Sequence, residues 1–336
     1  MFLSLKKAGV GVDLDTREVR VVELRGKPRS PELSAFGRLP LPEGAVRKGG
    51  IIDAQKVGEA LSTLWDQNGI STRDVVLGIS NQEILVRFAN FPKIAQEKLG
   101  NLIRLQAQDF LPLPLDKVVF DYLVVGENRD EEKESLEVLL VAARRDMVDG
   151  FLSALEAARL IPQDIDVSSL ALLRLIPPED RGKTVAVLHM PYEVGSILIA
   201  RDGNPRLARF IPVSLTEILG REFFHETRES IDPITIDWSE ESFSYWSDML
   251  TSELRSSIDY YQSQEEDYPV EQINLSGCGI RIEGLAERLQ ERFDIPVVTI
   301  DPLQGISLDQ QAEYLLSGRA SDFALNISLA LRGLEE

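Results

Sequence analysis

The sequence predicts a mixed α/β protein of two lobes, and three observations support this. At 336 residues the chain is longer than a typical single domain, so two lobes or a domain with an insertion are expected. Strand-like and helix-like segments alternate along it. Each half also opens with a pair of strands that resembles a hairpin and closes with a helix. The two halves therefore echo one another.

The charge balance argues against two classes of partner, nucleic acid bound without sequence specificity and anionic lipid. Acidic residues number 55 against 36 basic residues, which gives a net charge of −19. Nonspecific binding to nucleic acid and adsorption to anionic lipid both depend on Lys and Arg side chains. The single cysteine, Cys278, allows no internal disulfide and fits a reducing compartment. Because no apolar run approaches the roughly 18 residues of a membrane span, we expect a cytoplasmic protein that only a partner could hold at a membrane.

The first half begins with three strands and a helix. The strands are expected in "AGVGVDLD", "EVRVVEL" and "PELSAFGRLPL", separated by the turns "DTRE" and "RGKPRS". The helix starts after Asp53, a suitable N-cap, and its apolar residues recur at helical spacing. "DVVLGIS" is then a short strand of the buried type.

A compact α+β unit over residues 84–166 is expected as an insertion into the first lobe. It contains the strand "ILVRFANFP", the helix "EKLGNLIRLQAQDF", which the prolines of "LPLPLDK" end, and a helix from Asp146 to Arg159. "VVFDYLVV" and "LEVLLVAAR" are expected to pair across the charged loop "GENRDEEKES". "DIDVSSLALLRLI" then returns to a strand and a helix.

The second half opens with the predicted hairpin "VAVLHMPYEVGSILIARDG", residues 185–203, and the strand "RLARFIPVS". An acidic, helix-rich stretch follows. "VEQINLSGCGIRIEGLAERLQERFDIPVVTIDP" predicts a strand, a glycine turn, a helix and a strand. The last apolar helix lies in "SDFALNISLALRG", with Ser321 as its N-cap and Gly333 as its stop.

Several segments, in order, carry a family resemblance. "GVGVDLDTREVRVVEL" resembles the first phosphate hairpin of the actin-like ATPase superfamily, and "LSGCGIRIEGLAERLQERFDIPV" resembles its adenosine loop. The middle of the chain and the ending "FALNISLALRG" resemble the type IV pilus assembly protein PilM family. The matching middle residues are Phe91-Pro92, Phe110-Leu111-Pro112, Val118, Asp121-Tyr122, Leu140, Ala142-Ala143-Arg144, Leu160, Pro162, Asp164 and Asp166-Val167.

The resemblance implies an actin-like fold, which is a duplicated ribonuclease-H-like fold of two lobes with an inserted α+β subdomain called 1C. Subdomain 1A would comprise residues 1–83, completed by 167–184 and 318–336, and 1C residues 84–166. Subdomain 2A would comprise residues 185–217 and 263–317, and 2B residues 218–262.

The resemblance also implies a role as a cytoplasmic scaffold of the type IV pilus, or of a related secretion or DNA-uptake machine. Such a scaffold is recruited to the inner face of the inner membrane. Its implied partner is the N-terminal cytoplasmic tail of a PilN-like membrane protein, with a pilus motor ATPase as a second candidate. In the family the tail lies in a groove between 1A and 1C. Phe110, Leu111 and Leu113 are our candidates for one wall of that groove, although prolines after a helix are also ordinary stop signals.

The residues of the nucleotide site depart from what phosphate binding requires. Such a site uses backbone N–H groups of two tight hairpins, and one Asp in each organises water around Mg²⁺. The first hairpin keeps Asp13 and Thr16 but has Asp15 where the family usually has Gly. In the second hairpin, His189 and Pro191 replace the Asp and the Gly, and proline has no N–H to donate.

Of the adenosine loop only Gly277 and Gly279 remain, around Cys278. We therefore expect an eroded site with weak or lost ATP and Mg²⁺ binding, no hydrolysis and no catalytic residue. The alternative is a functional actin-like ATP-binding protein with slow hydrolysis. A relative of the sugar kinases would need two intact phosphate hairpins. An actin-like protein of the cell-division type often ends in an amphipathic membrane helix, and the ending "RGLEE" does not have the basic, apolar character of such a helix.

Plainer explanations exist for the single reactive side chains. Asp13 at a strand end is typical of a turn or capping residue, and His189 in an apolar strand is typical of a buried, hydrogen-bonded histidine. His225, the other histidine, lies in an unrelated segment, so no metal site is expected. Cys278 has no base near it in the sequence and is expected to be a small buried residue.

Overall fold

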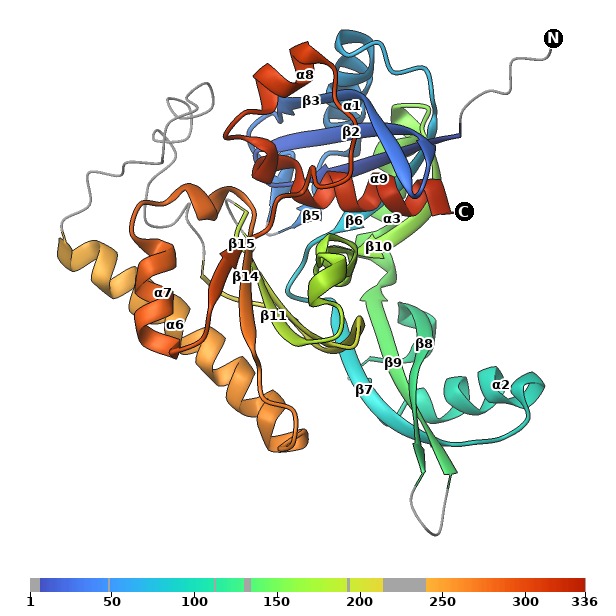
Figure 1. Cartoon of the computed structure of the whole chain (residues 1–336). Helices are drawn as coiled ribbons and strands as arrows, with labels where there is room; N and C mark the ends of the chain where they lie inside the picture. The colour runs from blue at the N-terminus through green and yellow to red at the C-terminus, as the bar shows by residue number, and fades with distance from the viewer. Residues whose placement is uncertain are drawn as a thin grey trace.

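The computed structural model describes residues 7–47, 49–111, 113–129, 134–191, 194–213 and 240–335. Two five-stranded sheets form the centres of two lobes, and a separate three-stranded sheet lies beside them (Figure 1). Part of the predicted acidic helical stretch, residues 218–239, lies outside the described residues, as do Pro112 and His225.

The strands of the first sheet have the order β10-β6-β1-β2-β3. Their bounds are β1 Ala8–Leu14, β2 Glu18–Lys27, β3 Ser30–Pro40, β6 Asp74–Ile79 and β10 Ile161–Val167. The second sheet has the order β13-β12-β11-β14-β15. Its strands are β11 Thr184–His189, β12 Ser196–Arg201, β13 Asn204–Phe210, β14 Gln272–Ser276 and β15 Val297–Thr299.

The two sheets have the same topology. In the first, β1, β2 and β3 form an antiparallel meander, and β6 and β10 continue the sheet in parallel from β1. In the second, β11, β12 and β13 form the meander, and β14 and β15 continue in parallel from β11. The predicted duplication is thus confirmed strand by strand, and with it the two-lobe α/β fold class.

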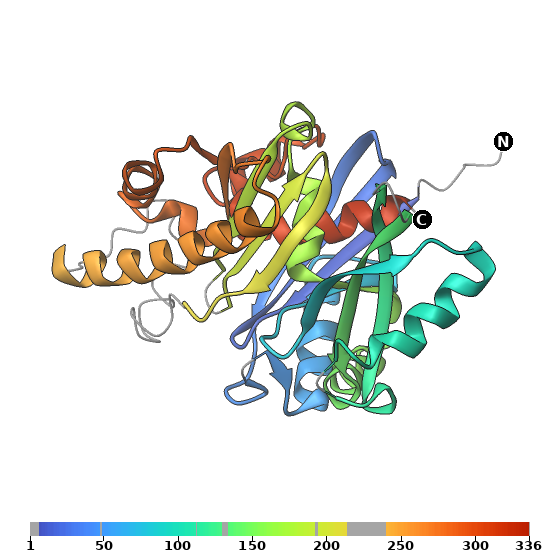
Figure 2. The same cartoon turned by 90° about the horizontal axis from the view of Figure 1, so that it is seen from below.

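The third sheet has the order β7-β9-β8, with β7 Leu85–Pro92, β8 Val118–Arg129 and β9 Glu134–Arg144. The helix α2 (Gln96–Ala107) packs on one face through Leu99 and Ile103 and projects away from both lobes (Figure 2). A small hairpin of β4 (Val46–Arg47) and β5 (Gly50–Ile51) completes the strands of the described residues. β8 and β9 extend into "GENRDEEKES", so the predicted loop is shorter than expected at both ends.

The remaining helices cover the sheets. They are α1 Ala54–Gln67, α3 Arg145–Ala157, α4 Ser168–Ala171, α6 Glu240–Gln264, α7 Leu285–Phe293, α8 Gln310–Leu316 and α9 Ala324–Glu335. Five short 3₁₀ segments also lie in the described residues: η1 Leu115–Lys117, η2 Leu172–Leu175, η3 Pro178–Asp180, η4 Cys278–Arg281 and η5 Ala320–Phe323. Asp53 caps α1 as predicted, since its side chain accepts the Lys56 N–H at 3.1 Å.

The predicted inserted unit contains residues that pack on the first lobe. α3 packs against α1, and β10 pairs in parallel with β6 of the first sheet. Residues 145–166 therefore belong to the first sheet and its helical cover, and the separate three-stranded sheet ends at Arg144. Sequence periodicity could not reveal this, because it shows which face of an element is apolar but not which core receives it.

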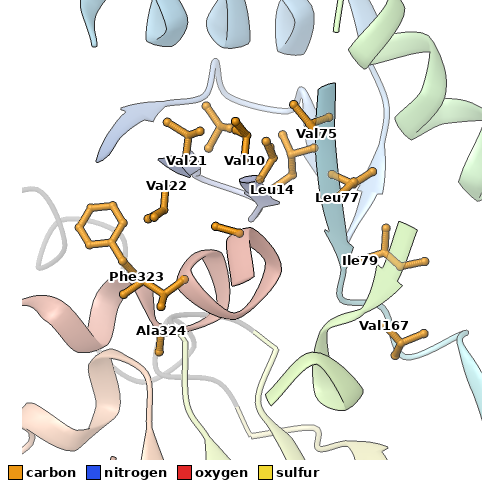
Figure 3. Close-up of a cluster of buried hydrophobic side chains, with 14 of the residues drawn as sticks. Val10, Leu14, Val21, Val22, Val75, Leu77, Ile79, Val167, Phe323 and Ala324 are labelled. Atoms are coloured by element: carbon orange, nitrogen blue, oxygen red, sulfur yellow. The ribbon is translucent and has the colours of Figure 1, made fainter. Parts of the chain in front are cut away.

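The helix α9 packs directly on β1, and small residues permit the contact. A Cβ atom on Gly11 would lie 2.1 Å from the Asn326 carbonyl oxygen, and one on Gly9 equally close to that of Ala330. Figure 3 shows Phe323 at the end of η5 and Ala324 at the start of α9, beside the apolar side chains of β1, β2 and β6. These glycines of "AGVGVDLD" thus serve helix–sheet packing.

Both predicted ends of the last helix were wrong. Ser321 lies inside η5, before α9 starts, and caps nothing there. Gly333 lies within α9, where a Cβ would be 2.9 Å from the Cα of Gly9. Glycine at this position is therefore explained by close packing on β1 and does not end the helix.

Candidate functional site

The first-lobe and second-lobe hairpins meet at one small cavity. The turn between β1 and β2 is closed by the Asp15 N–H, which donates to the Glu18 carbonyl at 2.9 Å. Asp13 and Thr16 of this hairpin and His189 at the end of β11 line the cavity together. The structure thus brings three of the predicted nucleotide-site residues side by side.

Arg20 occupies the centre of this arrangement. Its Nη2 lies 2.9 Å from Asp13 Oδ2 and 3.6 Å from Asp15 Oδ2, and its Nε lies 3.7 Å from Glu18 Oε1. The Arg20 side chain is only 5% exposed. The sequence analysis missed this residue, although a signal existed: Arg20 stands directly opposite Asp13 in the register of the hairpin.

The surrounding carboxylates keep Arg20 charged although it is buried. Burial alone would lower the pKa of Arg20, but the carboxylates of Asp13, Glu18 and Asp15 outweigh burial and raise it above its ordinary value. Burial also raises the pKa of Asp13, and Arg20 opposes that shift. A fixed guanidinium cation therefore stands beside Asp13, the one Asp of the predicted phosphate site.

A second part of the network joins the two lobes. Arg20 Nη1 donates to the Asp322 carbonyl at 3.1 Å. Oδ2 of the buried Asp322 carboxylate in turn accepts hydrogen bonds from Arg38 of β3 and from Arg281 of η4, both at 3.2 Å. Arg281 follows β14 of the second sheet, whereas Arg38 belongs to the first sheet. The ion pairs of Asp322 therefore bridge the two lobes.

His189 is a buried, neutral side chain. Its Nδ1 lies 3.1 Å from Ser276 Oγ on the neighbouring strand β14. Burial is the main cause that lowers its pKa to about 3, and the positive charge of Arg20 adds to the shift. A neutral imidazole beside a fixed cation is unsuited to holding Mg²⁺, which prefers oxygen ligands.

The glycines of the predicted adenosine loop pack against the main chain after β11. A Cβ on Gly277 would lie 2.5 Å from the Met190 carbonyl oxygen, and one on Gly279 would lie 2.6 Å from Met190 Cβ. The Gly279 N–H donates to the same carbonyl at 2.9 Å. This packing explains both glycines, and contact with an adenosine stays a prediction. Burial raises the pKa of the Cys278 thiol between them, which leaves it unreactive.

The cavity is too small for a nucleotide. Its volume is about 20 Å³, whereas pockets for ligands of drug size hold about 300–1,000 Å³. The Thr16 N–H, a donor of the kind that grips phosphate, instead donates to Asp15 Oδ1 at 2.5 Å. Over the described part of the chain, no group of three or more His, Cys, Asp or Glu side chains is placed to hold a metal ion.

The three predicted groove residues have different environments. Leu111 is buried, whereas Phe110 is 40% exposed with its ring centroid 5.9 Å from that of Phe91. Leu113 lines a hollow of about 470 Å³ together with the first residues of β7, Arg144 and the end of β13. Of the three, Leu113 is the one that faces an open groove.

Comparison with known proteins identifies the family of this chain. The family model described as "Type IV pilus assembly protein PilM" matches residues 11–334. The chain belongs to the PilM family. The structure resembles that of the PilM-PilN type IV pilus biogenesis complex with a TM-score of 0.84 and 25% sequence identity, over 98% of this chain and 99% of that chain. The ethanolamine utilization protein EutJ from Carboxydothermus hydrogenoformans matches with a TM-score of 0.53 and 11% identity, over 96% and 89% of the two chains.

Membership of the PilM family establishes the general function and the fold. The protein is a PilM-like type IV pilus assembly protein with the actin-like ATPase fold. Among the described helices, none is both long enough and apolar enough to cross a membrane.

Proposed function

We propose that this chain is a cytoplasmic scaffold of the pilus platform that binds the N-terminal tail of a PilN-like membrane protein and has lost ATP hydrolysis. Its nucleotide site works as a permanent ionic lock between the lobes. The tail recruits the scaffold to the inner face of the inner membrane. Transmission of conformational change to a motor ATPase would then depend on the tail and not on nucleotide turnover.

The Arg20 cluster is the observation that carries the loss of ATP use. In an active site of this fold, a metal and phosphates place alternating charges between the two hairpins. Here the cationic Arg20 lies 2.9 Å from Asp13, and the carboxylates of Asp15 and Glu18 lie at 3.6 and 3.7 Å from the same guanidinium, so acids outnumber the cation. Phosphates would meet these carboxylates at short range in a buried site, where repulsion between like charges is strong.

The tail-binding role rests on the comparison and on a groove. The solved structure that shares 25% identity with this chain is a PilM-PilN complex. The hollow at Leu113 offers apolar side chains, such as Ile84 and Phe210, beside the charged Arg87 and Arg144. This mixture suits a short peptide, which gains affinity from apolar pockets and orientation from polar contacts.

The test is a titration of the purified chain with a synthetic peptide that has the tail sequence of the PilN-like protein from the same organism. We expect saturable binding, with the same Kd in the absence of nucleotide and at millimolar ATP with Mg²⁺. Absence of binding would refute the scaffold role. A Kd that changes tenfold with ATP would instead favour the alternative, a nucleotide-responsive protein with slow hydrolysis.

A further inference from the structure

The three-stranded sheet is joined through the chain to the first lobe, yet it also contacts the second lobe. The chain enters this sheet from β6 of the first sheet and leaves it for α3, which packs against α1. Its edge strand β7 approaches β13, the edge strand of the second sheet (Figure 2). Val86 of β7 and Ala208 of β13 are both buried and belong to one apolar cluster. The sheet is therefore attached covalently to one lobe and held on the other by non-covalent contacts.

One ion pair spans this contact. Arg206 of β13 pairs with Glu137 of β9, and the two side chains are only 11% and 18% exposed. Glu137 stands between Asn90 of β7 and Gly126 of β8 in the register of the sheet. Arg206 therefore reaches past the edge strand to the central strand. Removing one partner of such a pair leaves the other charge in a place that water reaches poorly, so the pair favours the contact between sheet and lobe.

The strand β8 is shaped to leave room for this ion pair. Its pairing with β9 shifts in register after Val124, which makes a β-bulge at Val125 and places the next residue, Gly126, in line with the ion pair. A Cβ on Gly126 would lie 3.0 Å from Glu137 Oε2 and 3.8 Å from Arg206 Nη1. The φ angle of Gly126 lies outside the left-handed region, so the backbone conformation does not require glycine here. The space that the Glu137 carboxylate occupies explains the missing side chain.

The rest of the junction between sheet and lobe is open. A cavity of about 720 Å³ lies between β7, β13 and α6, and the Arg206 and Glu137 side chains form part of its wall. Exposed side chains line it on both sides, among them Arg87 of β7 and Tyr260 of α6. Contacts between two parts of a chain permit relative motion unless they are large and apolar. This junction is therefore suited to opening and closing.

The attached end of the sheet lies at a distance from the ion pair. Leu85 begins β7 and Arg144 ends β9, and the two strands pair side by side at this end. Along β9, Glu137 is about 20 Å from Arg144, at about 3.3 Å per residue. A small rotation at the attached end therefore moves Glu137 by several times more than it moves Arg144.

We propose that the Arg206–Glu137 pair is a clasp that holds the three-stranded sheet on the second lobe, and that the sheet turns about its Leu85 and Arg144 end when the clasp opens. The closed position is the one in the structure. Opening separates β7 from β13 and makes both sheet edges accessible. The clasp does not depend on tail binding or on nucleotide, since every group in it belongs to this chain and lies outside the Arg20 cluster.

Double electron–electron resonance tests the clasp by measuring the distance between two spin labels on the full chain. The labels are attached to Asn101→Cys on α2 and Ser252→Cys on α6, which are exposed positions, whereas the natural Cys278 is buried. With the clasp intact we expect a single distance. Arg206→Glu and Glu137→Gln should each add a second population whose distance differs by at least about 3 Å, the width of the water layer that replaces the ion pair.

Two further variants show whether the pair itself is the cause. Combining Arg206→Glu with Glu137→Arg restores opposite charges and should return the single distance. Arg201→Glu is the matched control and should not change the distance, because Arg201 pairs with Glu265 inside the second lobe at similar burial, 15% and 25% exposed.

The outcomes decide the proposal as follows. Circular dichroism identifies the variants that fold, and Glu137→Gln keeps the shape of the side chain, so the test stands even where charge reversal at Arg206 prevents folding. Folded clasp variants that keep the single distance would overturn the proposal. A second population in the Arg201→Glu control would also overturn it, because opening would then not depend on the Arg206–Glu137 pair.

Discussion

Replacing Arg20 by Met should destabilise the protein strongly, because it removes the cation from a buried cluster of acids. Asp13, Asp15 and Glu18 all lie within 4 Å of the guanidinium, at 2.9, 3.6 and 3.7 Å. The Asp13 and Glu18 side chains are 6% and 2% exposed, so solvent cannot take over the role of the cation. Removing one partner of a buried ion pair costs about 3–5 kcal/mol.

That free energy converts into a measurable shift. At about 2.1 cal/mol/K per residue, a chain of 336 residues has an unfolding entropy of about 0.7 kcal/mol/K, so the expected loss is about 4–7 °C in Tm. Differential scanning calorimetry at pH 7 measures it. Arg29→Met, in the exposed turn between β2 and β3, is the matched control and should change Tm by less than about 1 °C.

A double variant shows whether the charge is the cause. Adding Asp13→Asn to Arg20→Met removes one uncompensated carboxylate and should recover part of the lost stability. The reasoning would be refuted by an Arg20→Met protein as stable as the Arg29→Met control. It would also be refuted if Asp13→Asn lowered the Tm of the Arg20→Met protein further.

Three further predictions concern the same region. Because the pKa of His189 is about 3 in the folded chain and about 6.5 when unfolded, only the unfolded state binds this proton between those values, so acidification below pH 6.5 favours unfolding. Between pH 6.5 and 5 this lowers the free energy of unfolding by about 2 kcal/mol, which is about 3 °C in Tm. Thermal melts should show that this part of the fall in Tm disappears in His189→Gln and remains in His225→Gln. An equal dependence of Tm on pH in the two variants would contradict the prediction. Gly11→Ala places a Cβ against the Asn326 carbonyl and should give little folded protein, whereas Gly182→Ala, with open space around it, should express and melt normally. Cys278 should react with a thiol reagent only after denaturation, and rapid labelling of the native chain would show that the glycine turn opens.

The order of strands and helices could be predicted because apolar residues recur in each of them at the spacing typical of a strand or a helix. The strands of "AGVGVDLDTREVRVVEL" and of residues 185–203 form the two hairpins as expected. The helix after Asp53 begins at its predicted cap. Local patterns of this kind depend on neighbouring residues, so one sequence is enough to find them.

What the sequence did not predict depends on contacts between distant segments. Gly333 is a residue type that commonly ends helices, but here it is needed because it packs against Gly9, more than 300 residues earlier. Arg20 looked like one polar residue of an alternating strand, and only the register with Asp13 and the approach of Asp322 reveal its charge network. Leu113 was predicted with Phe110 and Leu111 as one wall, yet the three side chains face different environments.

The most direct test of the ionic lock is a calorimetric titration of the purified chain with ATP and Mg²⁺, with phosphate release followed in the same sample. We expect no binding heat up to millimolar ATP and no phosphate above the rate without protein, because Arg20 and its carboxylates fill the site. Saturable binding at micromolar ATP would contradict the account, since it would require Arg20 to leave Asp13 and the hairpins to open around the nucleotide.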